Sequence, residues 1–219
     1  MHEVLIVDDH PLILDAVRRV FEGHGAWSIS EAASYADAID RMGKLPIPDL
    51  VLLDLGLPGK FGLEAIRDFR IAYPEACCVV LSGEDKPENV IGAIDLGAMG
   101  FISKRSSGDA IMEAIGLISK GYVCTPKDTS GTHLRLKEQK TTLNPMELGL
   151  TGRQCEVLAQ LVRGKSNKAI ARVMNLSEAT VKTHIVAIFR VLNVHNRTGA
   201  VIAISKMGLQ LSLFEQPKT

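Results

Sequence analysis

Acidic side chains follow two apolar segments near the N-terminus, and their spacing suits phosphoryl transfer. Asp8 and Asp9 come directly after the run Val4–Val7, and Asp54 follows Leu50–Leu53. If the two runs are central parallel strands, the three carboxylates converge at one edge of a sheet. Carboxylates this close repel one another, and a divalent cation with oxygen ligands, typically Mg²⁺, relieves the repulsion.

Two further strand ends add a hydroxyl group and an ammonium group. Ser82 follows the apolar run Cys78–Leu81, and Lys104 follows Gly100–Ser103. A carboxylate nucleophile, a metal, a hydroxyl and a lysine together suit phosphoryl transfer, because one group attacks while the others neutralise the phosphoryl oxygens. A single Asp at a strand end is more often a turn former, but four matched strand ends favour a site.

A parallel sheet is needed to bring these residues together. The first 120 residues alternate short apolar runs with segments of helical period. This alternation predicts an α/β domain with a doubly wound, five-stranded parallel sheet of flavodoxin-like type. The expected strands are Val4–Val7, Ser28–Ala32, Leu50–Leu53, Cys78–Leu81 and Gly100–Ser103. The expected helices are Leu12–Glu22, Tyr35–Met42, Leu63–Ala72, Glu88–Leu96 and Gly108–Ser119.

The C-terminal part has helical patterns without strands, which predicts a small all-α domain. Its first three helices have good N-cap residues in Thr151, Ser166 and Ser177. The expected helices are Gly152–Val162, Asn167–Met174, Glu178–Leu192 and Thr198–Met207. A short turn joins the second helix to the third, which is typical of a helix-turn-helix whose later helix enters a DNA major groove.

The third of these helices has two different faces. One face is an apolar stripe of Val181, Ile185, Ile188 and Leu192. The opposite face carries Lys182, Thr183, Val186 and Arg190. A generic helical bundle with a solvated basic face would look similar, and charge alone would favour that interpretation.

Charge is distributed unevenly along a chain whose formal net charge is zero. Residues 1–120 have 11 basic and 19 acidic side chains, a net of −8, and residues 150–219 have 10 and 3, a net of +7. The 29 residues between them have 4 and 3, a net of +1, so the three parts sum to zero. The asymmetry predicts that only the C-terminal part meets a polyanion.

The remaining features indicate a two-domain cytoplasmic protein. We expect domains over residues 1–121 and 148–212, joined by a flexible linker over 122–147 that is rich in turn formers and has one helical turn in its middle.

The four cysteines lack zinc-site spacing and are expected to be reduced and mostly buried. No export signal or membrane-spanning run is visible, so no membrane association is expected.

Several segments of the N-terminal part resemble the receiver domain of two-component response regulators. The resemblance covers essentially all of residues 1–120 and is carried by Val7-Asp8-Asp9-His10, Asp54-Leu55-Gly56-Leu57-Pro58 with Gly62, Leu81-Ser82-Gly83 and Gly100-Phe101-Ile102-Ser103-Lys104. It implies that Asp54 accepts a phosphoryl group from a sensor histidine kinase.

The same resemblance implies roles for the neighbouring residues. Asp9 and Asp54 would hold Mg²⁺ directly with the Gly56 carbonyl, and Asp8 would support it through water. Ser82 and Lys104 would contact the phosphoryl oxygens. Phe101 would be an aromatic switch residue, although a plain core aromatic is an equal alternative. In this family, the positions of Gly56 and Glu84 flank the path of the water that hydrolyses the phosphoryl group. A Gly without a side chain beside an acidic Glu does not determine the lifetime of the phosphorylated form.

The C-terminal part resembles the LuxR-type helix-turn-helix over about residues 150–208. The segments Leu150-Thr151, Gly164-Lys165-Ser166-Asn167-Lys168, Thr180-Val181-Lys182-Thr183-His184 and Asn196-Arg197-Thr198 are among those that carry it. Together with a receiver domain, this is similar to the NarL/FixJ family. The resemblance implies groove contacts by Lys182 and Thr183, with Val186 able to meet a thymine methyl group. It also implies phosphate contacts by Lys165, Lys168, Arg190 and Arg197, and a homodimer contact through the last helix.

These inferences lead to a regulator of promoter DNA that is not itself an enzyme. We expect the unphosphorylated receiver to hinder either the DNA-binding face or the dimer helix, and phosphorylation to shift this equilibrium. One alternative is an aspartyl-phosphate hydrolase or phosphotransferase, which would commonly carry a second acid at the position of Gly56. Another is an interaction module whose helical part only dimerises, and a steep salt dependence of DNA binding would argue against it.

Overall fold

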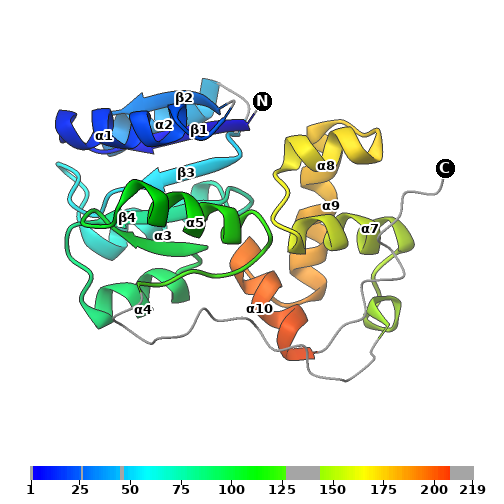
Figure 1. The fold of residues 1–219 in the computed structure, drawn as a ribbon. Coiled ribbons are helices and arrows are strands. Elements are labelled where there is room, and N and C mark those ends of the chain that lie inside the picture. Colours follow the sequence, from blue (N-terminus) through cyan, green and yellow to red (C-terminus); the bar gives the residue numbers. More distant parts are fainter. Residues whose placement is uncertain (1, 26, 45–46, 127–143, 208–219) are drawn as a thin grey trace.

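The N-terminal part of the chain forms a five-stranded parallel sheet with the strand order β2-β1-β3-β4-β5 (Figure 1). The computed structural model describes residues 2–25, 27–44, 47–126 and 144–207. The predicted doubly wound fold is confirmed, and all five expected strands are present. Their bounds are β1 (His2–Val7), β2 (Trp27–Ala32), β3 (Leu50–Leu53), β4 (Cys78–Ser82) and β5 (Gly100–Ser103).

The strand register brings the carboxyl ends of four strands to one edge. Strands β3, β4 and β5 are buried along their whole length, as their continuous apolar sequences require. Val7 of β1 pairs with Leu53 of β3, and Ser82 of β4 pairs with Ser103 of β5. The polar residues that follow these strands therefore start from neighbouring positions on the same edge.

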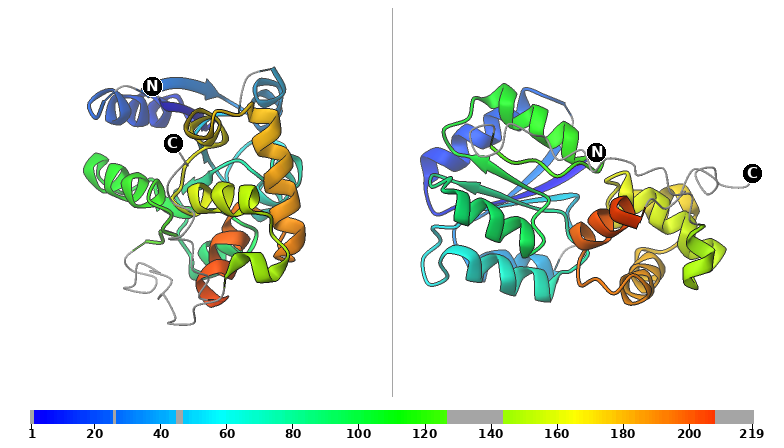
Figure 2. Two further views of the ribbon diagram at one scale, coloured as in Figure 1. Left: turned by 90° about the vertical axis from the view of Figure 1, so that its right-hand side faces the viewer. Right: turned by 90° about the horizontal axis from the view of Figure 1, so that it is seen from below.

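Helices cover both faces of the sheet (Figure 2). On one face, α1 (Pro11–Glu22) and α5 (Gly108–Ile118) bury an apolar cluster that includes Phe21 and Ile115. On the other face, α2 (Tyr35–Lys44), α3 (Gly62–Ala72) and α4 (Pro87–Asp95) bury a second cluster that includes Phe69. Burial of these apolar faces is the main stabilising contribution to the domain.

The C-terminal part is a small helical domain, as predicted. It consists of η1 (Pro145–Leu148), α7 (Gly152–Val162), α8 (Asn167–Met174), α9 (Glu178–Val191) and α10 (Arg197–Met207). All four predicted helices are present, with ends within one residue of the predicted ones. The apolar stripe of α9 is buried in the core of this domain.

The predicted N-caps fix where the helices begin. The Thr151 hydroxyl accepts from the Gln154 N–H at 3.3 Å, and the Gln154 side chain accepts from the Thr151 N–H at 2.8 Å, which completes a capping box. The Ser166 and Ser177 hydroxyls accept backbone N–H groups at the starts of α8 and α9. The turn between these helices contains Asn175 at φ 53°, a left-handed position that Asn tolerates well.

The first residues of the predicted linker still belong to the α/β domain. Cys124 forms a bridge with Gly100, and its carbonyl accepts the Phe101 N–H at 2.8 Å. Residues 127–143 of the linker, where its helical turn was expected, lie outside the described residues, as do residues 208–212. All four cysteines are buried and free, and burial raises the pKa of Cys78 to about 12. Within the described ranges, no helix has the length and apolar character to span a bilayer.

Candidate functional site

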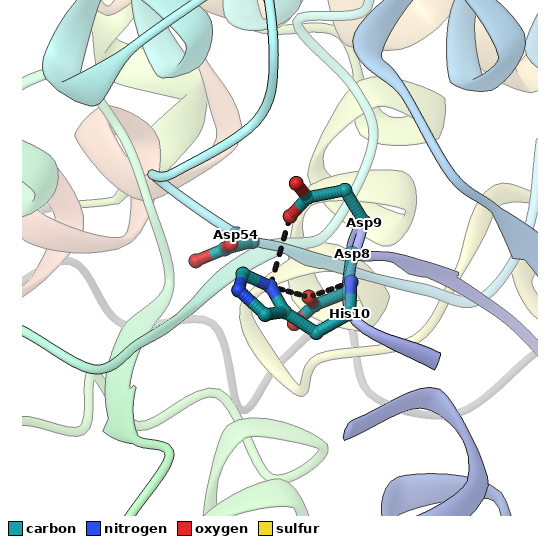
Figure 3. A group of neighbouring side chains, drawn as sticks. All are labelled: Asp8, Asp9, His10 and Asp54. Carbon is teal, nitrogen blue, oxygen red and sulfur yellow. Dashed lines mark hydrogen bonds and ion pairs between the residues drawn. The ribbon is translucent and has the colours of Figure 1, made fainter. Parts of the chain in front are cut away.

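The sheet edge predicted to carry the site does bring the three carboxylates together (Figure 3). Asp8 follows β1 and is fully buried, and Asp54 follows β3 and is 3% exposed. The Asp54 N–H donates to the Val7 carbonyl at 2.9 Å, which extends the strand pairing to the acid itself. One oxygen from each of Asp8, Asp9 and Asp54 lies within 4.8 Å of the others.

Lys104 reaches two of these carboxylates from the end of β5. Its Nζ lies 2.7 Å from Asp8 Oδ2 and 2.8 Å from Asp54 Oδ2. Burial alone would lower the pKa of Lys104, but the hydrogen bonds and charges of Asp54 and Asp8 outweigh it, so the pKa lies above its ordinary value. The ammonium group therefore stays charged at neutral pH and stands beside the Asp54 oxygens.

Ser82 ends β4 at the same edge, but its hydroxyl is engaged elsewhere. It accepts the Glu84 N–H at 3.2 Å and lies 3.4 Å from the Glu84 carbonyl oxygen. Among the hydrogen bonds of the described residues, none joins this hydroxyl to Asp54 or Lys104. The Lys104 N–H does donate to the Ser82 carbonyl at 2.8 Å, which ties the two strand ends together through the backbone.

Gly56 leaves one side of Asp54 uncovered. A Cβ at this position would lie 3.2 Å from Asp54 Oδ2, which is a tighter contact than most Cβ atoms make. The absence of a side chain therefore keeps this oxygen approachable. Phe101, the expected switch residue, has its ring buried in the core at 1% exposure, and its backbone pairs with Val80 of β4.

The donor set at this edge fits a bound Mg²⁺ ion. Three carboxylates and one ammonium group leave two negative charges, which one divalent cation would balance. Carboxylate oxygens are the ligands that Mg²⁺ prefers in proteins.

His10 also belongs to this cluster, although no role was predicted for it. Its Nδ1 lies 2.9 Å from both Asp8 Oδ1 and Asp9 Oδ1, and it shares the 4.8 Å cluster with Asp54. The one sequence feature that could have indicated a place for His10 in the cluster is its position directly after Asp8 and Asp9.

The helical domain presents the expected residues on the outer face of α9. Lys182, Thr183, Val186 and Arg190 are all exposed, and Val186 is 41% exposed despite being apolar. The buried and exposed faces of α9 thus follow the predicted division. Lys165 and Lys168, at the start of α8, are half-buried.

Two of these lysines are held by carboxylates of the α/β domain. Lys182 Nζ lies 2.7 Å from Glu75 Oε1, and Lys168 Nζ lies 2.5 Å from Glu3 Oε1. The Glu75 side chain, in the loop between α3 and β4, is only 2% exposed. Glu75 therefore holds the exposed side of α9 that is predicted to meet DNA against the other domain. The sequence did not indicate either of these ion pairs.

The start of α10 contacts the same domain. The Thr198 hydroxyl donates to the Gly97 carbonyl at 2.7 Å, and the Arg197 N–H donates to the Pro74 carbonyl at 3.4 Å. Thr198 is fully buried by this packing. The helix expected to form a dimer contact is thus partly covered by the α/β domain.

Arg197 does not lie where the sequence led us to expect it. A phosphate contact requires an exposed guanidinium, but Arg197 is 1% exposed and donates to the carbonyls of Leu161 at 2.7 Å and Lys165 at 2.5 Å. Leu161 lies in the last turn of α7, where its carbonyl also accepts the Arg163 and Gly164 N–H groups, and Lys165 lies in the loop that follows. Burial lowers the pKa of Arg197 to about 10. In this structure, its guanidinium caps the C-terminal end of α7.

We therefore expect Arg197→Met to destabilise the helical domain. The substitution keeps much of the buried volume but removes the guanidinium hydrogen bonds to the Leu161 and Lys165 carbonyls, so the free energy of unfolding should fall by about 2 kcal/mol. Urea unfolding followed by circular dichroism measures this change. Arg190→Met, which removes an exposed guanidinium, is the matched control and should change stability by no more than about 0.5 kcal/mol. Equal stabilities of the two variants would contradict the capping role.

Both parts of the chain match known families. Residues 4–116 match the response regulator receiver domain, and residues 148–204 match the bacterial regulatory proteins of the luxR family. A glycerol metabolism activator of Pseudomonas putida is 37% identical over 209 residues, which cover 93% of this chain and 95% of the relative. The nitrate/nitrite response regulator protein NarP of Escherichia coli is 38% identical over 201 residues, which cover 91% and 93%.

A solved structure has the same fold over both domains. The RcsB response regulator of Salmonella typhimurium superposes with a TM-score of 0.56 over 94% of this chain and 98% of its own, at 23% identity. The two family matches, in the same order and on the same parts of the chain as the two folded domains, confirm the resemblance to the NarL/FixJ family. The chain therefore belongs to the two-component response regulators that join a receiver domain to a LuxR-type DNA-binding domain.

Proposed function

We propose that Asp54 is the phosphoacceptor of this response regulator and that its donor is a phosphohistidine of a sensor kinase. The observation that carries the proposal is the position of Lys104 Nζ, 2.8 Å from Asp54 Oδ2 at an edge where the other carboxylates converge. An Asp54 oxygen would attack phosphorus, the new P–O bond forming as the P–N bond breaks. The electron pair of the broken bond would leave with the imidazole nitrogen of the donor.

The neighbouring residues would stabilise the negative charge that develops on the phosphoryl oxygens. Lys104 would contact one oxygen, and Ser82 would give up its interaction with Glu84 to contact another. Asp9 and Asp54, with the Gly56 carbonyl, would hold Mg²⁺ directly, and Asp8 would support it through water. When bound, the ion would supply electrostatic stabilisation of the same oxygens.

We also propose that the arrangement seen here is an inhibited state. The contacts of Lys182 with Glu75 and of Thr198 with Gly97 support this, because the first occupies the DNA-facing side of α9 and the second covers the start of α10. Phosphorylation would draw Ser82 and Lys104 inward and shift Phe101, which lies on β5 opposite Val80 of β4. The equilibrium would then favour separated domains that dimerise through α10 on paired DNA half-sites.

These assignments give each part of the chain its own function. Residues 1–121 would act as the phosphoacceptor domain, residues 122–147 as the connection and residues 148–212 as the DNA-binding domain. A kinase domain and promoter DNA as partners would place the chain in the cytoplasm. Lys182 and Thr183 would contact bases, Val186 would meet a thymine methyl group, and Lys165, Lys168 and Arg190 would contact phosphates.

DNA binding by the phosphorylated full-length chain should weaken steeply with salt, and Lys182 should account for part of that slope. We expect Lys182→Ala to reduce the slope of log K against log salt by about 1 if its ammonium neutralises one phosphate. Fluorescence anisotropy with a fragment recovered by genome-wide mapping of bound sites measures the slope. Lys120→Ala, at an exposed position after α5, is the control and should retain the wild-type slope. Salt-independent binding of the wild type would refute DNA binding through this face.

A further inference from the structure

The C-terminal ends of α5 and α7 meet where the two domains touch (Figure 1). Gly121 follows α5, and a Cβ at this position would lie 1.8 Å from the Val162 carbonyl oxygen, at the end of α7. Gly164 follows α7, and a Cβ there would lie 2.3 Å from the Ser119 carbonyl oxygen, at the end of α5. Cβ atoms essentially never come within 3.0 Å of a non-neighbouring heavy atom, so a side chain at either glycine is incompatible with this packing. Each glycine thus faces the backbone at the end of the other helix.

Both glycines also belong to a common type of helix ending. The N–H of the residue after each glycine donates to the carbonyl five positions before that residue, at 3.1 Å for α5 and 3.3 Å for α7. This is the Schellman motif, in which the residue before the donor takes a left-handed conformation. Gly121 has a φ of 89° and Gly164 a φ of 77°, as the motif requires. Because glycine adopts this conformation without steric cost, the motif alone is one explanation for both residues.

Two other helices of the chain show that this ending does not require glycine. At the ends of α8 and α9 the same hydrogen bond forms at 2.9 Å, and the left-handed positions are Asn175 at φ 53° and Asn193 at φ 52°. Asparagine tolerates the left-handed conformation better than most residues that have a side chain. The turn itself therefore accepts a Cβ. What distinguishes Gly121 and Gly164 is that the backbone of the other domain fills the space of a Cβ.

We propose that the end of α5 is the surface on which the helical domain docks, and that Gly121 and Gly164 determine whether the two domains can close. A carbonyl oxygen at a helix end cannot turn aside as a flexible side chain can, so the closed arrangement requires bare backbone at both positions. The contact involves no formal charge, so salt should affect it far less than it affects the ion pair of Lys182 with Glu75. Its effect on DNA binding rests on the proposed inhibited state.

Small-angle X-ray scattering of the full-length, unphosphorylated chain tests the proposal, because it measures closure independently of DNA. We expect Gly121→Asn and Gly164→Asn each to increase the radius of gyration, since the added Cβ cannot share the space of the carbonyl oxygen. Gly149→Asn is the matched control. Gly149 has the same φ of 89° as Gly121, but apart from its chain neighbours no heavy atom lies within 4 Å of a Cβ there, so this variant should keep the wild-type radius.

The outcomes separate this inference from the proposed inhibited state. A wild-type radius of gyration in either glycine variant, once circular dichroism shows that it is folded, overturns the docking role. A larger radius in Gly149→Asn as well assigns the effect to strain in the turn and also overturns it, as does failure of both Gly121→Asn and Gly164→Asn to fold. If one of the two does not fold, the other decides, because the two glycines belong to different domains.

DNA binding by the same variants tests the inhibited state itself. The opened variants should bind DNA about tenfold more tightly than the wild type without phosphorylation, because more chains have a free α9. Unchanged affinity in variants with a larger radius of gyration would contradict the inhibited state and would leave the docking surface in place.

Discussion

Replacement of Asp54 by Asn should abolish phosphorylation by acetyl phosphate and Mg²⁺, with the loss seen as the disappearance of the shifted band on a Phos-tag gel. The amide keeps the size of the side chain and its place beside Lys104, but it lacks the nucleophilic carboxylate oxygen that lies 2.8 Å from Nζ. Asp8 also contacts Lys104, at 2.7 Å, but it is fully buried, so we expect that it does not take over as the acceptor.

Asp37→Asn is the matched control for this experiment. Asp37 lies on α2, where it forms an ion pair with Arg41 and has no part in the cluster, so the variant should shift as the wild type does. A wild-type shift of Asp54→Asn would show that phosphoryl transfer uses another residue. Loss of the shift in both variants would point to damaged folding, which circular dichroism of the two proteins distinguishes.

Glu75→Gln should raise the affinity of the unphosphorylated chain for its DNA by about tenfold, a change of about 1.4 kcal/mol in binding free energy. The carboxylate is almost fully buried against Lys182 at 2.7 Å, and its neutralisation removes the charge that holds the exposed side of α9, which we propose faces DNA. Lys182 is half exposed, so water can solvate its ammonium once the partner is lost. The population of chains with a free α9 should therefore grow without phosphorylation.

The control for this variant must remove the same charge elsewhere on the receiver. Glu64→Gln does so from an exposed position in the first turn of α3, and it should leave DNA affinity near the wild-type value. Fluorescence anisotropy with the same DNA fragment compares the three proteins. If Glu64→Gln and Glu75→Gln bind DNA equally, the effect comes from lower overall repulsion and the ion pair does not restrain α9.

The elements and the acidic cluster were predictable because their signals are local. Apolar runs such as Leu50–Leu53 identify buried strands, and a parallel sheet then brings their carboxyl ends together whatever the connecting helices do. The helix starts followed from Thr151, Ser166 and Ser177, whose hydroxyls satisfy N–H groups within three residues. Each of these inferences needs only neighbouring residues or a general rule of topology.

The features that sequence could not supply depend on packing between distant segments. Arg197 looks like any basic residue until α7 is placed beside it, and only then does its guanidinium meet the Leu161 carbonyl of that helix and the Lys165 carbonyl of the following loop. Glu75 and Lys182 are 107 positions apart, and nothing in either neighbourhood predicts that they meet. His10 was visible next to Asp9, but its ring orientation decides its role, and the sequence does not determine that orientation.

The hydrogen bond between Thr198 and Gly97 has a consequence for how output depends on protein abundance. If α10 joins two copies on DNA, the intramolecular partner and the second copy compete for one helix. The effective concentration of an intramolecular partner is fixed, whereas the concentration of second copies rises as the cell makes more protein. Dimerisation therefore competes better with the intramolecular contact at high protein levels. Overproduction alone would then partly fill the promoter sites, and the occupancy would rise more steeply than in proportion to protein concentration.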